Sequence, residues 1–266
     1  MNKSQILALY EKDQRKDVEY PGSRRELTPG IVRHIDTTGH GEGAIIYSQL
    51  DGTNVDDAIR EQVSYFEGVG QDFEWKVFDY DTPSDLKERL RSHGFTVDES
   101  EAIMVLDLAD APRILWQPVP PSVKRIMRPD EVSVVLAIEE QIWQEDLSGL
   151  GHYLRQALSN YPEQMSVYVA YADEQPASTA WIYFPEHSQF ASLWGGSTLD
   201  RYRKQGLYTG LLAARAQEAK ARGRGYLTVD ASEMSRPILE KFGFEMIAES
   251  FPCKWKRETQ KAKTDA

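Results

Sequence analysis

The sequence predicts an α/β protein in which two successive domains each contain a mixed β-sheet flanked by helices. Three observations support this prediction. Strand-like and helix-like segments alternate along the chain, a proline-rich stretch lies near its middle, and a strand, a helix ending in Gly-Phe and a second strand follow one another once in each half. At 266 residues the chain is long enough for each half to bury a core of its own.

The first half opens with an amphipathic helix predicted from Ser4 to Asp17, with Ser4 as its cap. Two β-rich pieces between Gly30 and Leu50 flank the turn TTGHGEG and predict a hairpin. Its spaced glycines indicate a turn rather than a phosphate loop, because no helix follows them. A helix from Asn54 to Phe66 and the strand–helix–strand order of residues 73–108 complete this half, with Phe66, Trp75, Phe78 and Phe95 as expected core.

The segment APRILWQPVPPSV contains four prolines and predicts a stiff linker. We therefore expect a first domain at 1–110, a linker at 111–122, a second domain at 123–258 and a disordered tail at 259–266. The second half reads as two helices, three strands, a helix, a strand, a short helix and a closing strand pair. Because residues 74–108 and 225–255 repeat the same order of elements, we interpret the halves as a duplication whose first copy is degenerate.

Composition excludes several classes of function. The net charge of -11 argues against nucleic acid and anionic membrane as partners, because both need clustered basic residues. The only cysteine, Cys253, excludes an intrachain disulfide and is expected to be a small packed side chain, and the five histidines lack metal-ligand spacing, so no metal is expected. Without a signal peptide or an apolar run of membrane-spanning length, a cytoplasmic location is the expectation.

The segment TLDRYRKQGLYTGLL, residues 198–212, carries the most information about function. A strand enters a basic turn with a glycine, and the turn opens directly into a helix. Such a turn directs backbone N–H groups and the positive end of the helix dipole at one point, which suits a pyrophosphate. Gly206 permits close approach to the main chain, and Arg201, Arg203 and Lys204 add positive charge. The alternative is a solvated basic helix start.

This loop resembles the acyl-CoA signature of the GNAT superfamily, which is Gln or Arg, two residues, Gly, one residue, then Gly or Ala. The sequence matches it at Arg203 and Gly206 and departs from it at Tyr208. The resemblance implies tandem GNAT-like domains, with acetyl-CoA bound by the second. It implies cofactor-binding residues on the strand end, the loop and a later turn, namely Ser197, Thr198, Leu199, Arg203, Lys204, Gln205, Gly206, Leu207, Tyr208, Thr209 and Ser232.

Residues 226–244 are similar to the second signature of the family, but Ser232 and Leu239 occupy the positions of its usual Asn and Tyr. That Tyr reprotonates the departing CoA thiolate, so Ser232, Ser235 or Tyr208 is left to supply the proton. Asp230 is the candidate base or amine anchor, against the alternative that it only caps the following helix.

The resemblance implies an N-acetyltransferase that moves an acetyl group to a small-molecule amine by direct attack on the thioester. A backbone N–H near Thr198 is the expected donor to the thioester carbonyl. The runner-up is a non-catalytic acyl-CoA-binding or sensing protein, and a third interpretation is an interaction scaffold. The first half has the acidic run Asp51-Gly52-Thr53-Asn54 where the second has its basic loop, so we expect it to cover the substrate cleft rather than to bind CoA.

Overall fold

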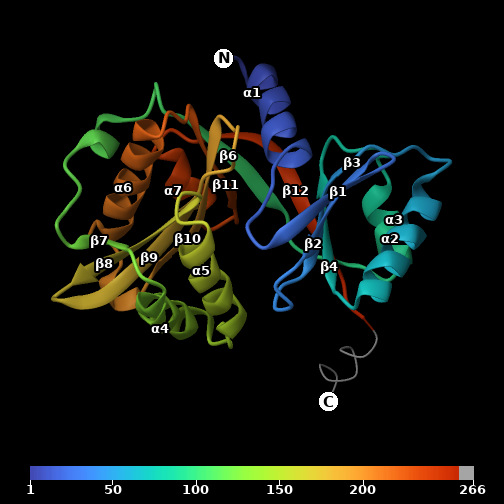
Figure 1. The fold of residues 1–266 in the computed structure, drawn as a ribbon. Coiled ribbons are helices and arrows are strands. Elements are labelled where there is room, and N and C mark those ends of the chain that lie inside the picture. Colours follow the sequence, from blue (N-terminus) through green and yellow to red (C-terminus); the bar gives the residue numbers. More distant parts are fainter. Residues whose placement is uncertain (258–266) are drawn as a thin grey trace. The chain divides into compact units, whose positions relative to one another are not determined.

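The structure, a computed structural model, describes residues 1–257, and contacts divide the chain into two compact units (Figure 1). Unit 1 consists of residues 1–103, 230–236 and those from 246 onward, and unit 2 consists of 104–229 and 237–245. The expected tail at 259–266 lies outside the described residues. The units interleave along the sequence, and the boundary at 111–122 stays a prediction about independently folding domains.

Unit 1 contains a mixed sheet with the strand order β1-β2-β3-β4-β12. Its neighbours are antiparallel except for the parallel pair β3 and β4, and β5 pairs with β12. The strands are β1 Ser23–Thr28, β2 Ile31–Asp36, β3 Gly43–Ser48, β4 Phe73–Phe78, β5 Thr96–Val97 and β12 Glu245–Trp255; β6 Glu101–Asp107 is divided between the units. Of its helices, α2 Val55–Val69 and α3 Leu86–Ser92 cover one face of this sheet (Figure 1).

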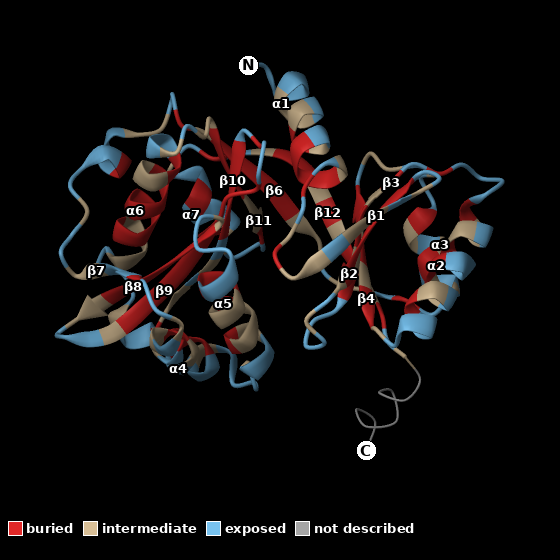
Figure 2. Cartoon of the chain, in the orientation of Figure 1, coloured by how far each residue is buried: buried red, intermediate tan, exposed pale blue. Residues whose placement is uncertain are grey.

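The expected hairpin between Gly30 and Leu50 is confirmed by the antiparallel pairing of β2 and β3. The aromatic core of the first half is also confirmed, and Figure 2 shows the buried strands and inner helix faces that form it. Phe66 stacks on Phe73 with 4.1 Å between ring centroids, and Trp75 is fully buried. These rings anchor α2 to β4, because large apolar surfaces removed from water dominate the stability of a small unit.

The N-terminal helix differs from the expectation in its cap and its length. The helix α1 spans Lys3–Tyr10, and Asn2 rather than Ser4 caps it through a reciprocal pair of hydrogen bonds with Gln5. The chain continues from Glu11 to Lys16 as a π-helical segment. That wider turn contains the buried Arg15, which forms an ion pair with Asp81 at 2.7 Å.

Unit 2 contains the strands β11-β10-β9-β8-β7 in that order, with one parallel pair, β10 with β11. Its strands are β7 Val123–Ile126, β8 Met165–Ala172, β9 Gln175–Tyr183, β10 Phe190–Thr198 and β11 Tyr226–Ala231. Its helices are α4 Val132–Trp143, α5 Ser148–Asn160, α6 Leu207–Ala221 and, beginning at the border of unit 1, α7 Arg236–Glu240.

Helices α4 and α6 contact β9 and β10 from opposite faces (Figure 1). The hydroxyl of Ser197 on β10 donates to Glu139 of α4. A Cβ added to the preceding Gly196 would instead meet Tyr208 and Arg215 of α6. Successive residues of β10 therefore point at different helices, and the strand forms the middle layer of unit 2.

The proline-rich segment packs against α6. Residues Arg113–Trp116 form a 3₁₀ turn in which Leu115 is buried. The side-chain amide of Gln217 on α6 donates to the carbonyls of Leu115 and Gln117, at 2.8 and 2.7 Å. The prolines give the segment stiffness, and these contacts fix it to unit 2.

The closing strand pair predicted for the second half is wrong. Residues Glu245–Trp255 form one strand, β12, which pairs with β4 of unit 1 over six register positions. Cys253 and Trp255 join the core of unit 1, and Cys253 is fully buried, as expected. Burial raises the pKa of its thiol to about 12. The last strand of the second half therefore completes unit 1.

Candidate functional site

The basic loop between β10 and α6 leaves the start of the helix open. Gly206 is the residue before the first turn of α6, with φ of +82°, and no side chain caps this end. The first N–H groups of a helix have no partner within the helix, and the helix dipole adds positive potential there. A Cβ on Gly206 would meet no atom within 4 Å, so the space in front of these amides is open. The geometry suits an anion.

Basic side chains surround this helix start. Arg201, Arg203 and Lys204 are exposed. Arg203 forms an ion pair with Asp200 at 2.8 Å, and the guanidinium of Arg201 lies 4.9 Å from the ring centroid of Tyr202. Both contacts are solvent-exposed and therefore weak, so these cations can move to a phosphate at little cost.

Strand β10 has a half-paired edge beside this loop. Its parallel register with β11 covers only Phe190–Ser192, although β10 continues to Thr198. On its other side, the pairing with β9 shifts by one residue between Trp194 and Ser197, which is a β-bulge. The last six residues of β10 therefore extend beyond the β10–β11 ladder. On that side of the strand an extended ligand could pair with their backbone groups.

A buried arginine on α6 supports this bulge. The guanidinium of Arg215 donates to the carbonyl oxygens of Trp181 and Trp194, at 3.4 Å each, and to Leu211 within its own helix. Burial lowers its pKa to about 10. Because the bulge frees these carbonyls from regular strand pairing, the arginine supplies donors that the sheet lacks. Sequence reasoning missed Arg215, although it continues the inward stripe of α6 set by Leu211 and Leu212.

A buried carboxylate lies on the opposite face of β10. Glu139 of α4 is 2% exposed. Its Oε2 accepts hydrogen bonds from Trp143 Nε1 at 2.8 Å and from Ser197 Oγ at 3.0 Å. Burial raises the pKa of this carboxyl, and the two hydrogen bonds act in the opposite direction. Sequence reasoning missed Glu139 as well. Its position seven residues after the buried Val132 places it on the same side of α4 and could have indicated that it is buried.

Three predicted catalytic residues belong to unit 1. Asp230 forms an ion pair with Lys76 of β4. The hydroxyls of Ser232 and Ser235 lie 3.2 Å apart in the exposed turn before α7, where Ser232 O accepts from Ser235 N. The loop residues 203–209 and the strand residues 197–199 belong to unit 2.

Among residues 1–257, no helix is both long and apolar enough to cross a membrane. The described part of the chain also contains no group of three or more His, Cys, Asp or Glu side chains arranged to hold a metal ion.

The model of the acetyltransferase (GNAT) domain family matches residues 138–260. This segment is a GNAT acetyltransferase domain. It contains Glu139, the bulged strand, the basic loop and α6. The residues predicted from the two signatures of the family therefore all fall within the matched segment.

Solved structures with the same fold cover nearly the whole chain. A GCN5-related N-acetyltransferase from Kribbella flavida aligns over 95% of both chains, with 15% identity and a TM-score of 0.66. A tandem GNAT protein from the clavulanic acid biosynthesis pathway covers 90% of this chain and 84% of its own, with 13% identity and a TM-score of 0.59. These similarities show that the chain shares the fold of these proteins, one of which is described as a tandem GNAT protein. No curated protein matches the sequence.

Two of the three residues that depart from the GNAT signatures, Leu239 and Tyr208, have different surroundings. Leu239, at the position of the usual Tyr, is buried and offers no hydroxyl. Tyr208, at the position of the small residue in the loop, is partly buried with its ring against Gly196 and 6.3 Å from that of Phe242. Burial raises the pKa of Tyr208, so its phenol stays protonated at neutral pH.

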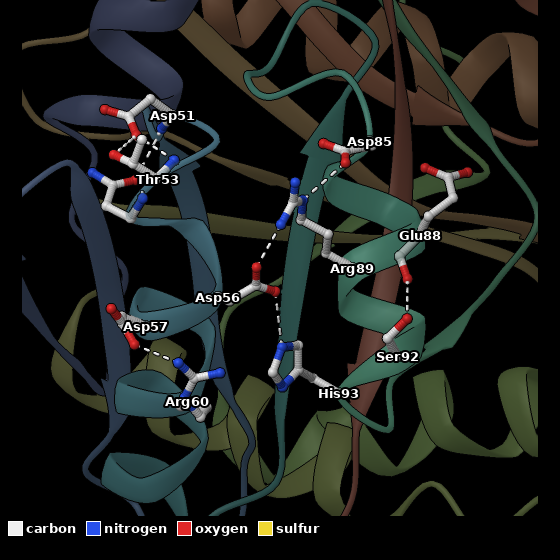
Figure 3. Close-up of polar contacts among 11 residues, drawn as sticks. Asp51, Thr53, Asp56, Asp57, Arg60, Asp85, Glu88, Arg89, Ser92 and His93 are labelled. Carbon is white, nitrogen blue, oxygen red and sulfur yellow. Dashed lines mark hydrogen bonds and ion pairs between the residues drawn. The ribbon is translucent and has the colours of Figure 1, made fainter.

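The GNAT-like first half fills the start of its own helix with a carboxylate. Asp51 Oδ1 accepts from Thr53 N at 2.8 Å, from Thr53 Oγ1 at 2.6 Å and from Asn54 N at 3.2 Å (Figure 3). On the same helix Asp56 contacts Arg89 and His93 of the α3 region (Figure 3). The carboxylate of Asp51 thus occupies the turn that leads into α2, whereas no side chain caps the start of α6.

Proposed function

We propose that the protein is an N-acetyltransferase that transfers the acetyl group of acetyl-CoA to the amine of a small acceptor. The observation that carries this proposal is the uncapped, glycine-opened start of α6 beside the half-paired edge of β10, within a GNAT domain. An anion site at a helix start and an open strand edge together fit a ligand with a pyrophosphate and an extended amide-bearing arm.

In this proposal the amides of residues 205–209 bind the pyrophosphate, and Arg203 and Lys204 add charge from the loop. Residues 197–199 of the strand end run beside the pantetheine arm, and an N–H near Thr198 polarises the thioester carbonyl. Ser232 remains a predicted cofactor contact.

The amine nitrogen attacks the thioester carbonyl directly, and the tetrahedral intermediate then expels the CoA thiolate. Among the predicted proton donors, Tyr208 has the strongest support, because it is part of unit 2 with its ring against Gly196 of β10. Ser232 and Ser235 stay as further candidates. The ion pair of Asp230 with Lys76 supports a structural role for this acid in unit 1, and its role as base stays a prediction.

One observation favours the second candidate, a non-catalytic acyl-CoA-binding protein. Leu239 places an apolar, buried side chain where the family has its proton donor. Both candidates bind acetyl-CoA, but only an enzyme releases CoA faster when an amine is added.

Thermal unfolding with and without acetyl-CoA tests the site, because a ligand bound only by the folded state raises the midpoint. We expect a shift in the wild type that is lost in Gly206→Glu, whose carboxylate would stand in front of the amides. Gly223→Glu is the matched control: Gly223 lies just beyond the other end of α6, with φ of +75° and open space around its Cβ position.

A shift that survives in Gly206→Glu, or no shift at millimolar ligand, would contradict the proposed site. Amine-dependent release of CoA, measured with a thiol reagent, then separates the enzyme from the binding protein.

A further inference from the structure

The carboxylate of Glu139 is only half satisfied. Both of its donors, Trp143 Nε1 and Ser197 Oγ, approach Oε2. Oε1 is buried and has no hydrogen-bond partner among the described residues. No charged side chain is among the causes that shift the pKa of Glu139. One oxygen of the carboxylate is thus hydrogen-bonded, and the other has no donor among the described residues.

Such an arrangement costs stability. A buried carboxylate oxygen that lacks a partner loses its hydration without compensation. A glutamate that served only to pack α4 on β10 would be replaced by an apolar residue at lower cost, as at Val132 and Val135 on the same stripe. A ligand that donates a hydrogen bond to Oε1 would offset this loss of stability.

Two tryptophans lie on the same side of β10 as Glu139. Trp194 pairs with Trp181, and Ser197 pairs with Thr179, so Trp194 and Ser197 share a sheet face. Trp143 donates to Glu139 itself. The side chains of Trp143 and Trp194 are exposed, at 58% and 44%.

A carboxylate flanked by exposed indole rings suits an organic cation, because the acid pairs with the charge and the rings attract it through their faces. We propose that Glu139 Oε1 binds the ammonium group of the acceptor and accepts its proton, while Trp143 and Trp194 contact the apolar part of the same molecule. The proposal rests on the acetyltransferase function proposed above.

The proton balance of the step is complete. The ammonium passes one proton to Glu139, and the resulting amine attacks the thioester carbon. The new N–C bond forms first, and the C–S bond of the tetrahedral intermediate then breaks. The second proton goes from nitrogen to the leaving thiolate, and Glu139 releases its proton to water. A buried carboxyl with a raised pKa suits this task, because it is a stronger base than an exposed glutamate.

Other titratable groups occur on the elements packed against α4. Strand β10 contains none. The others lie in the turn before α4, on α4 itself, on α5 and on β9, and they are Asp130, Glu131, Glu140, His152, Tyr153, Arg155 and Tyr183. Glu140, the exposed neighbour of Glu139, provides a matched control on the same helix.

The test compares Glu139→Gln with Glu140→Gln in the full chain. The first measurement is binding of hexylamine and 2-phenylethylamine to the CoA complex, with 1-hexanol and 2-phenylethanol as neutral counterparts. We expect Glu139→Gln to weaken binding of the amines by about 30-fold or more, as for a buried ion pair that loses one partner. The alcohols should bind both variants equally.

The second measurement is amine-dependent CoA release. At pH 7 we expect kcat/KM of Glu139→Gln to fall about 100-fold or more. It should recover as the pH approaches the pKa of the amine, because the amine is then already deprotonated in solution. The thermal shift with acetyl-CoA should stay at the wild-type size.

Equal amine binding and turnover in Glu139→Gln and wild type would overturn the role of Glu139 and leave the proposed function standing. A thermal shift lost together with activity would also overturn it, by showing a structural role. A wild type that binds acetyl-CoA but neither binds these amines nor releases CoA would overturn the enzyme and the proposal together.

Discussion

His34 is a buried histidine that the fold holds in its neutral form. It is 3% exposed on β2, its Nδ1 lies 3.2 Å from Ser23 Oγ, and its Nε2 is buried with no hydrogen-bond partner among residues 1–257. The ring of Tyr20 packs edge-on at 5.1 Å. Burial is the largest cause of its pKa falling to about 4, and the nearby charge of Arg25 acts in the same direction.

This depressed pKa predicts a pH window of lost stability. Between pH 6.5 and about 4 the unfolded chain binds a proton at His34 that the folded protein excludes, so stability falls as the pH is lowered through this range. We expect His34 to account for a loss of about 2 kcal/mol between pH 6.5 and 4.5. Urea unfolding of wild type and His34→Gln at these two pH values measures it. Equal losses in both proteins would show that other groups cause the decline.

At the scale of elements, the starts of α2 and α6 differ in what their amides face. Asp51 satisfies the amides ahead of α2, whereas a left-handed glycine and open space precede α6. The two halves therefore differ at the start of these helices, and the start of α6 is the one at which we propose the pyrophosphate binds.

This contrast predicts a stoichiometry of one acetyl-CoA per chain, because the carboxylate of Asp51 occupies the turn before α2, whereas a glycine without a capping side chain precedes α6. Isothermal titration of the wild type measures the number of sites, and Gly206→Glu should reduce it to none. Two sites, or one that persists in Gly206→Glu, would place a cofactor elsewhere in the chain.

The sequence predicted strongly periodic elements and the basic loop because their signals are local. The turn TTGHGEG and the helix-opening Gly206 depend on few neighbouring residues. Glu139 and Arg215 were missed because charged residues on a helix are ordinarily solvated, and only the sheet packed over α4 and α6 buries them. The short strand β7 was missed for a similar reason, since four residues carry too little periodicity to stand out.

At the scale of the molecule, the order of elements along the chain does not show which strand completes which unit. The strand–helix–strand order of each half was visible in the sequence, and the similarity in fold to a tandem GNAT protein agrees with it. The partner of the last strand was not visible, because strand pairing between distant segments leaves no local pattern. The pairing of β12 with β4 joins residues more than 170 positions apart, and it brings Trp255 against Phe73 with 5.6 Å between ring centroids.

The interleaved units predict that a change near the C-terminus destabilises the first half. Trp255→Ala should cost about 3–5 kcal/mol, because it removes a buried ring from the core of unit 1. Lys254→Ala, at the adjacent, partly exposed residue that pairs with Asp98, should cost less than about 1 kcal/mol.

Hydrogen exchange locates the effect. We expect β4 and β12 to lose protection together in Trp255→Ala while β8 and β9 keep theirs, because β12 completes the sheet of unit 1. Loss confined to β8 and β9 would instead support a domain that runs without interruption from 123 to 258, as the proline-rich boundary predicts. The same pair of variants therefore decides between the sequence boundary and the interleaved units.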